Sequence, residues 1–225
     1  MVEKLDYAQQ AKWPQTSGQQ QSPIALTVKA GQEIEAADLL EWQVPYYGET
    51  LSDEGNNLQL AGRGFAKLDH RNYRFVQMHL HTPAEHTIEG QQPAMEWHFV
   101  HENSLGQKAV VAVTAVLGKE NPQLNQILAA FVPKTAVPLP ETILLTSLLP
   151  TRGLIYRYVG SLTTPPLSEG VEWFVAAEPV TISAAQLAQY RELFPQDNNR
   201  ELQPLNQRPV MGYNLGDGSP EQPEY

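Results

Sequence analysis

Two histidines that stand one residue apart constrain this chain more than any other feature. They are His79 and His81, in the run VQMHLH at residues 76–81. Side chains alternate across a β-strand, so residues at positions i and i+2 point to the same face. A strand at this place would project two imidazoles side by side, which is the arrangement that a single metal ion needs from one strand.

A second strand-like run, MEWHFVH at residues 95–101, offers a third imidazole, His98. Three histidines from two strands, with a fourth position left open, are typical of a catalytic zinc site. A lone strand histidine is more often a hydrogen-bonded core residue. All six histidines lie within residues 70–101, however, and burying so many rings without a shared purpose would need many hydrogen-bond partners. We therefore predict a metal site that activates water.

Composition limits the kinds of site and partner. A chain of 225 residues can bury a substantial core, and one domain over residues 1–225 is the simplest prediction. The absence of cysteine excludes disulfides and thiolate ligands, so a transition metal must use imidazole and carboxylate ligands. The net charge of −10 argues against nucleic acid or an anionic membrane as partner. No segment reaches membrane-spanning length, and no secretory signal is visible at the start.

Strands are predicted to dominate the fold. Residues 65–68, 73–78 and 109–117 are short β-rich runs bounded by turn residues, and residues 69–72 between the first two are predicted to form a hairpin turn. The run 109–117 is nearly all apolar, as expected for a central strand that is covered on both faces.

Two helices are predicted from their capping residues. Asn121 and Pro122 precede a helix over residues 123–131, and Ser183 can cap a helix over residues 184–194. The second helix carries an apolar stripe of Leu187, Tyr190, Leu193 and Phe194.

Two proline-rich segments are predicted to lack regular structure. Residues 132–151 are expected to form a loop that packs on the core through Ile143, Leu144, Leu145, Leu148 and Leu149. The tail from residue 214 onward, rich in Gly, Pro and Glu, is expected to be poorly ordered.

Ligating histidines usually donate their other ring N–H to a carboxylate, amide or carbonyl. Gln77 stands two residues before His79, and Glu96 stands two residues before His98, so each shares a strand face with a candidate ligand. A competing pattern also exists, because His79 and His81 followed by Glu85 and Gly90 imitate the first motif of the cupins. The second cupin motif carries a Pro-x-Gly before its histidine, and nothing similar precedes His98.

Several runs, read together, closely resemble the α-class carbonic anhydrases. They are QMHLH (77–81), AEHT (84–87), EWHFVH (96–101) and SLTTPPL (161–167), with QSPI (21–24) near the start and NR (199–200) and QPLN (203–206) near the end. The match covers nearly the whole chain in the family's order.

The resemblance implies a mainly β, single-domain fold. Its centre would be a large, mostly antiparallel twisted sheet, with a few short peripheral helices and zinc at the base of a conical cavity. By motif position, the Zn²⁺ ligands would be His79, His81 and His98. Thr163 would accept a hydrogen bond from zinc-bound hydroxide and donate its own proton to Glu85, since a hydroxyl has one proton to donate.

The implied reaction is the reversible hydration of carbon dioxide to bicarbonate and a proton, by attack of zinc-bound hydroxide, and sulfonamides are expected to inhibit it. The residues that match the family's apolar substrate wall are Val100, Val113, Leu162, Val171 and Trp173. Thr164 would face bicarbonate on the polar side. His86 and His101 match histidines of a structural hydrogen-bond network and are not predicted as ligands.

The chain departs from the family where protons leave the site. Many members carry a histidine after a glycine at the cavity wall, and Asn56 holds that position here. An amide cannot take up and release a proton near neutral pH. We therefore predict proton export through buffer, through water chains near Tyr7 and Gln59, or weakly through Glu54.

Two other functions stay open at this point. The first is a cupin-like oxygenase with iron or manganese. The second is a non-catalytic carbonic-anhydrase-related binding protein, although such relatives typically lose a ligand. A monomer or a homodimer is expected. The cysteine pair of many secreted bacterial relatives is absent, which favours the cytoplasm over a periplasmic or secreted form with its signal removed.

Overall fold

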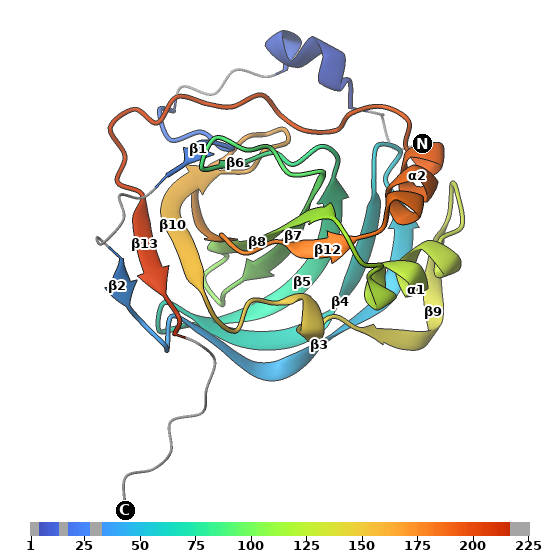
Figure 1. Cartoon of the computed structure of the whole chain (residues 1–225), viewed down its shortest axis with the longest axis horizontal. Helices are drawn as coiled ribbons and strands as arrows, with labels where there is room; N and C mark the ends of the chain where they lie inside the picture. Colours follow the sequence, from blue (N-terminus) through green and yellow to red (C-terminus); the bar gives the residue numbers. More distant parts are fainter. Residues whose placement is uncertain (1–4, 14–17, 28–32, 217–225) are drawn as a thin grey trace, which may run out of the picture.

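Figure 1 shows the computed structural model of the chain, which describes residues 5–13, 18–27 and 33–216. One large sheet occupies the centre, and a two-stranded sheet of β1 and β6 lies apart from it. Helices are short and lie at the periphery. The helices are η1 (Tyr7–Lys12), α1 (Pro122–Ala130), η2 (Thr146–Leu148) and α2 (Ala184–Leu193), where η denotes a 3-10 helix.

The large sheet is mixed, and antiparallel pairs outnumber parallel ones. Its strand order is β2-β13-β10-β11-β8-β7-β5-β4-β3-β9, and β12 also pairs with β8. Strand β8 runs parallel to β11 and β12, whereas β7 is antiparallel to both β5 and β8. The strands are β1 (Ala25–Leu26), β2 (Ile34–Glu35), β3 (Leu40–Asp53), β4 (Leu58–Leu68), β5 (Arg71–His81), β6 (Thr87–Ile88), β7 (Met95–Glu102), β8 (Lys108–Leu117), β9 (Ala136–Leu144), β10 (Leu154–Ser161), β11 (Glu169–Ala176), β12 (Val180–Ile182) and β13 (Met211–Asn214).

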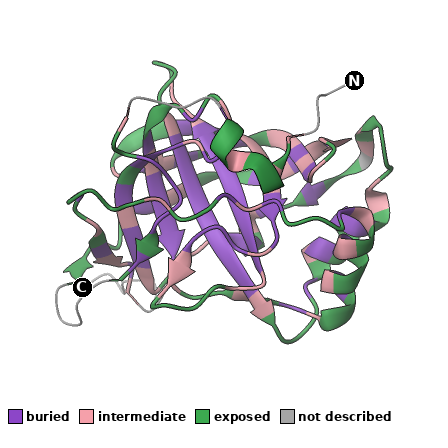
Figure 2. Cartoon of the chain, turned by 90° about the horizontal axis from the view of Figure 1, so that it is seen from above, coloured by how far each residue is buried: buried purple, intermediate pink, exposed green. Residues whose placement is uncertain are grey.

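The central strands are buried on both faces, which positions the site inside the molecule (Figure 2). Every residue of β7 except the last is buried, and so are seven consecutive residues of β8. Because side chains alternate, these strands contribute to two apolar clusters. Trp97 and Phe99 belong to the larger cluster, while Val100 and Val110 belong to the smaller one with Trp173.

The predicted strands are confirmed, and the predicted hairpin turn is present but shorter, because residues 71 and 72 already belong to β5. The three predicted runs lie inside β4, β5 and β8. Asp69 and His70 form the turn, with φ values of 46° and 62°. Two successive residues at positive φ give the turn a twist that suits a tight antiparallel hairpin.

Both predicted helices are present with their caps. The Asn121 side chain accepts hydrogen bonds from the backbone N–H groups of Gln123 and Leu124, and Ser183 forms a capping box with Gln186. In the predicted stripe of α2, Tyr190 and Phe194 are buried, and Leu187 and Leu193 pack against the core.

The structure corrects the two proline-rich segments. Residues 132–151 contain an edge strand, β9, that pairs with β3, so this segment is not simply a loop. Leu144 is 44% exposed, because alternation in an edge strand turns it outward while Ile143 and Leu145 point inward. In the tail, Asn214 ends β13 and Leu215 is buried, so order extends beyond residue 214. Residues 217–225 lie outside the described part of the chain. Within the described residues, no helix has the length and apolar character needed to cross a membrane.

Candidate metal centre

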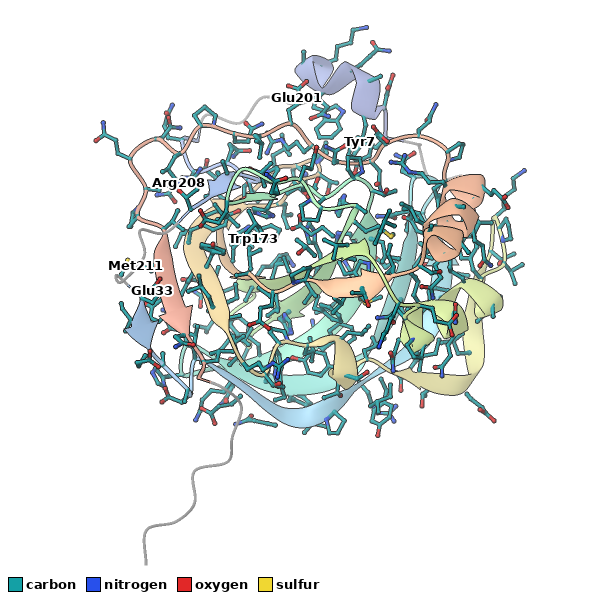
Figure 3. All side chains as sticks on the ribbon, viewed as in Figure 1. Tyr7, Glu33, Trp173, Glu201, Arg208 and Met211 are labelled. Atoms are coloured by element: carbon teal, nitrogen blue, oxygen red, sulfur yellow. The ribbon has the colours of Figure 1, made fainter. Side chains whose placement is uncertain are left out.

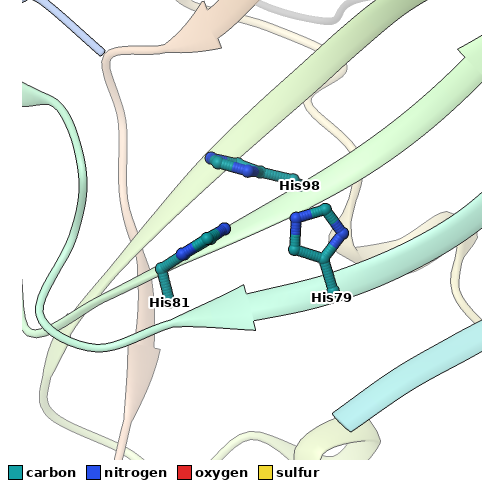
Figure 4. Close-up of side chains that lie close together, drawn as sticks. All are labelled: His79, His81 and His98. Carbon is teal, nitrogen blue, oxygen red and sulfur yellow. The ribbon is translucent and has the colours of Figure 1, made fainter. Parts of the chain in front are cut away.

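The three predicted ligands lie together on two neighbouring strands (Figure 4). His79 and His81 lie on β5, and His98 lies on β7 directly opposite His79. The ring centres are 5.0 Å apart for His79 and His81, 5.2 Å for His79 and His98, and 4.5 Å for His81 and His98. One ring nitrogen from each histidine lies within 4.8 Å of the other two.

The protein bonds one nitrogen of each ring and leaves the other available. His79 donates from Nδ1 to Gln77 Oε1 at 2.9 Å, and His81 donates from Nδ1 to the Asn198 carbonyl at 2.7 Å. His98 donates from Nε2 to Glu96 Oε1 at 2.8 Å. The remaining nitrogen of His81, Nε2, is buried and has no hydrogen-bond partner among the described residues. A buried acceptor without a partner is costly, so this atom indicates that a ligand belongs here.

The environment favours neutral rings, which can bind a cation. Burial lowers the pKa of all three histidines, and the neighbouring rings lower it further for His79 and His98. Burial is also the largest influence on His81, whose pKa falls to about 4. At neutral pH each ring therefore offers a lone pair rather than a charge.

Glu96 is an ionised carboxylate that orients both His98 and the backbone around it. Its Oε1 also accepts from His86 Nδ1 at 2.6 Å, and its Oε2 accepts from the N–H groups of Glu85 and His86. Burial alone would raise the pKa of Glu96, but His86 and His98 outweigh it and hold the pKa well below its usual value. Because Oε1 already accepts from both rings, the group of His86, Glu96 and His98 is a hydrogen-bond cluster rather than a second metal site.

The other two buried histidines are also bonded within the protein. His86 Nε2 lies 2.7 Å from the Tyr158 hydroxyl. His101 donates from Nδ1 to the Ala109 carbonyl at 3.3 Å, so its Nε2 accepts from the Tyr46 hydroxyl at 2.8 Å.

Glu85 and Thr163 lie beside the triad. Both are buried, and Glu85 Oε1 accepts from the Arg200 N–H at 2.8 Å. Burial raises the pKa of Glu85, and the contacts with His98, the Arg200 N–H and the Thr163 hydroxyl act in the opposite direction. Within the part of the chain that the structure describes, Glu85 Oε2 has no partner of full hydrogen-bonding geometry, so it can accept a hydrogen bond from the Thr163 hydroxyl.

An apolar wall is present, with one correction. Val100, Val171 and Trp173 belong to the smaller apolar cluster, and Leu162 packs against it. Val113 lies opposite Trp97 and faces the other side of the sheet, in the larger cluster. The residue of β8 that pairs with Val100 is Val110.

The residues predicted for proton transfer fall into two places. Gln59 on β4 pairs with His79. Tyr7 and Asn56 line a cavity of about 560 Å³ that also reaches Asn198 and Glu201. The Asn56 carboxamide is occupied, because Nδ2 donates to the Leu5 carbonyl at 2.6 Å.

Sequence reasoning missed Asn198, which accepts the hydrogen bond from His81. The two residues are separated by 117 positions, so no local spacing could connect them. The only signal was the Asn-Arg pair that follows it at residues 199–200, which matched the family without an assigned role.

Comparison with known proteins identifies the family. The model of eukaryotic-type carbonic anhydrases matches residues 7–214. A carbonic anhydrase of Klebsiella pneumoniae is 37% identical over 202 residues, which cover 87% of this chain and 80% of that protein. One of Neisseria gonorrhoeae is 34% identical over 203 residues, covering 87% of this chain and 78% of that protein.

Solved structures agree. The Photobacterium profundum α-carbonic anhydrase superimposes with a TM-score of 0.79 at 35% identity, covering 87% of this chain and 90% of that one. The Thermovibrio ammonificans α-carbonic anhydrase, solved with the inhibitor sulfanilamide, gives a TM-score of 0.77 at 36% identity, covering 86% and 87% of the two chains. These matches decide against the cupin alternative and against a non-catalytic binding protein. The chain belongs to the α-class carbonic anhydrases, enzymes that catalyse the reversible hydration of carbon dioxide to bicarbonate and a proton.

Proposed function

We propose that His79, His81 and His98 bind one Zn²⁺ ion, through Nε2 of the first two and Nδ1 of the third. The observation that carries this proposal is the pairing of the opposite ring nitrogens with Gln77, Asn198 and Glu96. Such partners fix the tautomer and the ring orientation of a ligand. When bound, zinc lowers the pKa of a coordinated water to about 7, a value known for carbonic anhydrases rather than obtained from this chain.

Thr163 and Glu85 would orient the nucleophile. If the Thr163 hydroxyl donates its proton to Glu85, its oxygen can only accept. The nucleophile must then donate its own hydrogen to Thr163 Oγ1, which leaves a lone pair directed at the substrate. Burial of both side chains keeps competing water away from this pair.

The substrates are small, and the walls of the site fit them. Carbon dioxide is apolar, so we assign its binding to Val100, Leu162, Val171 and Trp173, and add Val110 in place of Val113. Thr164 is partly exposed on the polar side, where we place bicarbonate. A sulfonamide is expected to inhibit by competing at the same position.

Proton release would then use water and buffer rather than a titrating side chain. Tyr7, Asn56 and Gln59 are polar and can hold water, but none has a proton to exchange near neutral pH. Burial raises the pKa of Tyr7 far above its usual value, which removes it as a proton carrier. Water chains and dissolved buffer would carry the proton.

The proposal also covers the domain count, the oligomeric state and the location of the protein. We infer one domain, a monomer or homodimer, and a cytoplasmic location, the last because the chain contains no cysteine. Light scattering tests the oligomeric state, and fractionation of the source cells tests the location.

Stopped-flow measurement of carbon dioxide hydration tests the proposed function. Activity should disappear with a zinc chelator and return with added zinc. His98→Ala should lose both bound zinc and activity. Full activity of metal-free protein, or zinc retained in His98→Ala without loss of rate, would contradict the assignment of the site.

A further inference from the structure

An irregular segment, residues 198–201, supplies two backbone groups to the proposed zinc site. The Asn198 carbonyl accepts from His81 Nδ1 at 2.7 Å, and the Arg200 N–H donates to Glu85 Oε1 at 2.8 Å. This segment belongs to no helix or strand. Its inner edge therefore contributes to the orientation of a metal ligand and of the carboxylate beside Thr163. Asn198 is also held at the end of β5, where its side chain accepts from the Thr82 N–H at 2.7 Å and donates to the Leu80 carbonyl at 2.9 Å.

The side chain of Gln10 in η1 binds the outer edge of the same segment. Gln10 Nε2 donates to the Asn199 carbonyl at 3.1 Å, and Gln10 Oε1 accepts from the Glu201 N–H at 2.9 Å. In Figure 3, Tyr7 of the same helix and Glu201 are labelled together at the upper edge of the molecule. The N-terminal helix thus lies against the segment that holds the site.

A carboxamide offers the same donor and acceptor as a peptide group. In a parallel ladder, one strand residue bonds the carbonyl before and the N–H after its neighbour. Gln10 makes this pair of bonds around Arg200. Its second N–H donates to the Tyr7 carbonyl at 3.1 Å, so the amide is held in place from its own helix. Gln10 therefore takes the role of a missing neighbouring strand.

The side chain of Arg200 is fixed independently. Its guanidinium donates from Nη1 to Gln21 Oε1 at 2.8 Å and to the Ser22 carbonyl at 2.7 Å. The Arg200 side chain is thus held on one side, and Gln10 holds the flanking peptide groups on the other. Between them, the Arg200 N–H donates to Glu85.

From these contacts we infer that Gln10 is a positioning residue for the reaction. It acts through residues 198–201 on both His81 and Glu85, and touches neither the substrate nor the metal. The inference rests on the proposed zinc site. It predicts that loss of the Gln10 carboxamide loosens the metal and misdirects the Glu85 and Thr163 pair, while the fold stays intact.

The chain offers a matched control in the neighbouring residue. Gln9 is exposed, and among the described residues its side chain donates only to Oδ2 of Asp6, the N-cap of η1. Gln9→Ala and Gln10→Ala therefore remove the same chemical group from adjacent positions, and only Gln10→Ala removes contacts to residues 199 and 201.

The experiment compares both variants with wild type, all loaded with zinc, by three readouts. These are the rate of zinc release into a chelator, kcat/KM for carbon dioxide hydration, and the melting temperature. Mutation of a residue that bonds directly to a metal ligand typically lowers metal affinity by about 10–100-fold. Because Gln10 acts one contact further out, we expect Gln10→Ala to release zinc about threefold to tenfold faster and to show a similar fall in kcat/KM. Gln9→Ala should match wild type.

The outcomes separate the inference from the proposed function. If wild type binds no zinc, the proposed site fails and the inference fails with it. If wild type binds zinc but Gln10→Ala matches Gln9→Ala in zinc release and kcat/KM, only the inference is overturned, whatever the melting temperatures. If Gln10→Ala does not fold, Gln10→Glu replaces it, since a carboxylate keeps the acceptor for Glu201 and loses both donors. Wild-type behaviour of Gln10→Glu would equally overturn the inference.

Discussion

His79 and His98 face each other across β5 and β7 as direct antiparallel partners, with ring centres 5.2 Å apart. Both strands lie inside the sheet, and each is paired on both sides. His81 lies two residues further along β5. The backbone hydrogen bonds of the sheet, rather than loops, therefore hold all three proposed ligands in place. A site built this way is expected to keep its geometry without metal, because rigid elements position its ligands.

Zinc should stabilise the folded chain through this site. A ligand that binds only the folded state adds about 4 kcal/mol at a thousand times its Kd, which corresponds to roughly 8–16 °C in Tm for a domain of this size. Thermal unfolding with zinc and with chelator measures the difference. In His98→Ala the zinc-dependent shift should disappear. An equal shift in that variant would show that zinc binds elsewhere.

Thr163 should affect the rate far more than the metal. Removing one pre-oriented hydrogen-bonding group from an active site lowers kcat by about 100-fold or more, so Thr163→Ala should lose about that factor in kcat/KM. Zinc content should stay at one per chain, because the hydroxyl is not a ligand. Thr163→Ser keeps the hydroxyl and should recover most of the rate. Stopped-flow kinetics with metal analysis checks both, and loss of zinc in Thr163→Ala would reassign this residue to the metal site.

His101 should make the protein less stable as the pH falls. Burial lowers its pKa to about 4 in the folded state, below the unfolded value of roughly 6.5. The unfolded state therefore takes up the proton first. The stabilising contribution is complete above about pH 6.5 and is lost as the pH falls toward 4, amounting to roughly 3 kcal/mol for a shift of this size.

His101→Gln isolates this effect, since an amide keeps a donor and an acceptor for Ala109 and Tyr46 but does not titrate near these pH values. Denaturant unfolding in chelator at several pH values gives the slope for each protein. The variant should show a slope smaller by about 1.4 kcal/mol per pH unit near pH 5. If the free energy of unfolding depends on pH with the same slope in both proteins, protonation of His101 does not cause the loss of stability at low pH.

Much of the metal site could be predicted because its information is local. The spacing of His79 and His81 sets their common face, and the same spacing places Gln77 beside His79. The caps at Asn121 and Ser183 are equally local, and both are present. In each case the residue and its partner lie within one element, so periodicity alone relates them.

What failed depended on register or on distant pairing. Val113 and Val110 are both apolar residues of one buried strand, and only the pairing of β8 with β7 shows that Val110 shares the face of Val100. The prolines of β9 made its sequence look like that of a loop. An edge strand tolerates proline because fewer of its backbone N–H groups must pair with a neighbouring strand. Asn198 and Gln10 act through contacts between segments far apart in sequence, which no pattern within either segment encodes.

Proton export should depend on buffer, because Asn56 cannot titrate. Its Nδ2 donates to the Leu5 carbonyl at 2.6 Å, so the side chain ties the N-terminal segment instead of moving between water and the site. General acid–base groups contribute 10²–10⁴-fold when well placed, so turnover of wild type should rise by about tenfold or more as an imidazole-type buffer is added. Asn56→His supplies an internal base and should weaken this dependence. Asn56→Ala breaks the contact with Leu5 without adding a base, and should keep the dependence of wild type. Stopped-flow rates across a buffer series at fixed pH and ionic strength compare the three proteins. If wild type turns over as fast without added buffer as Asn56→His does, protons leave by an internal route that bypasses residue 56.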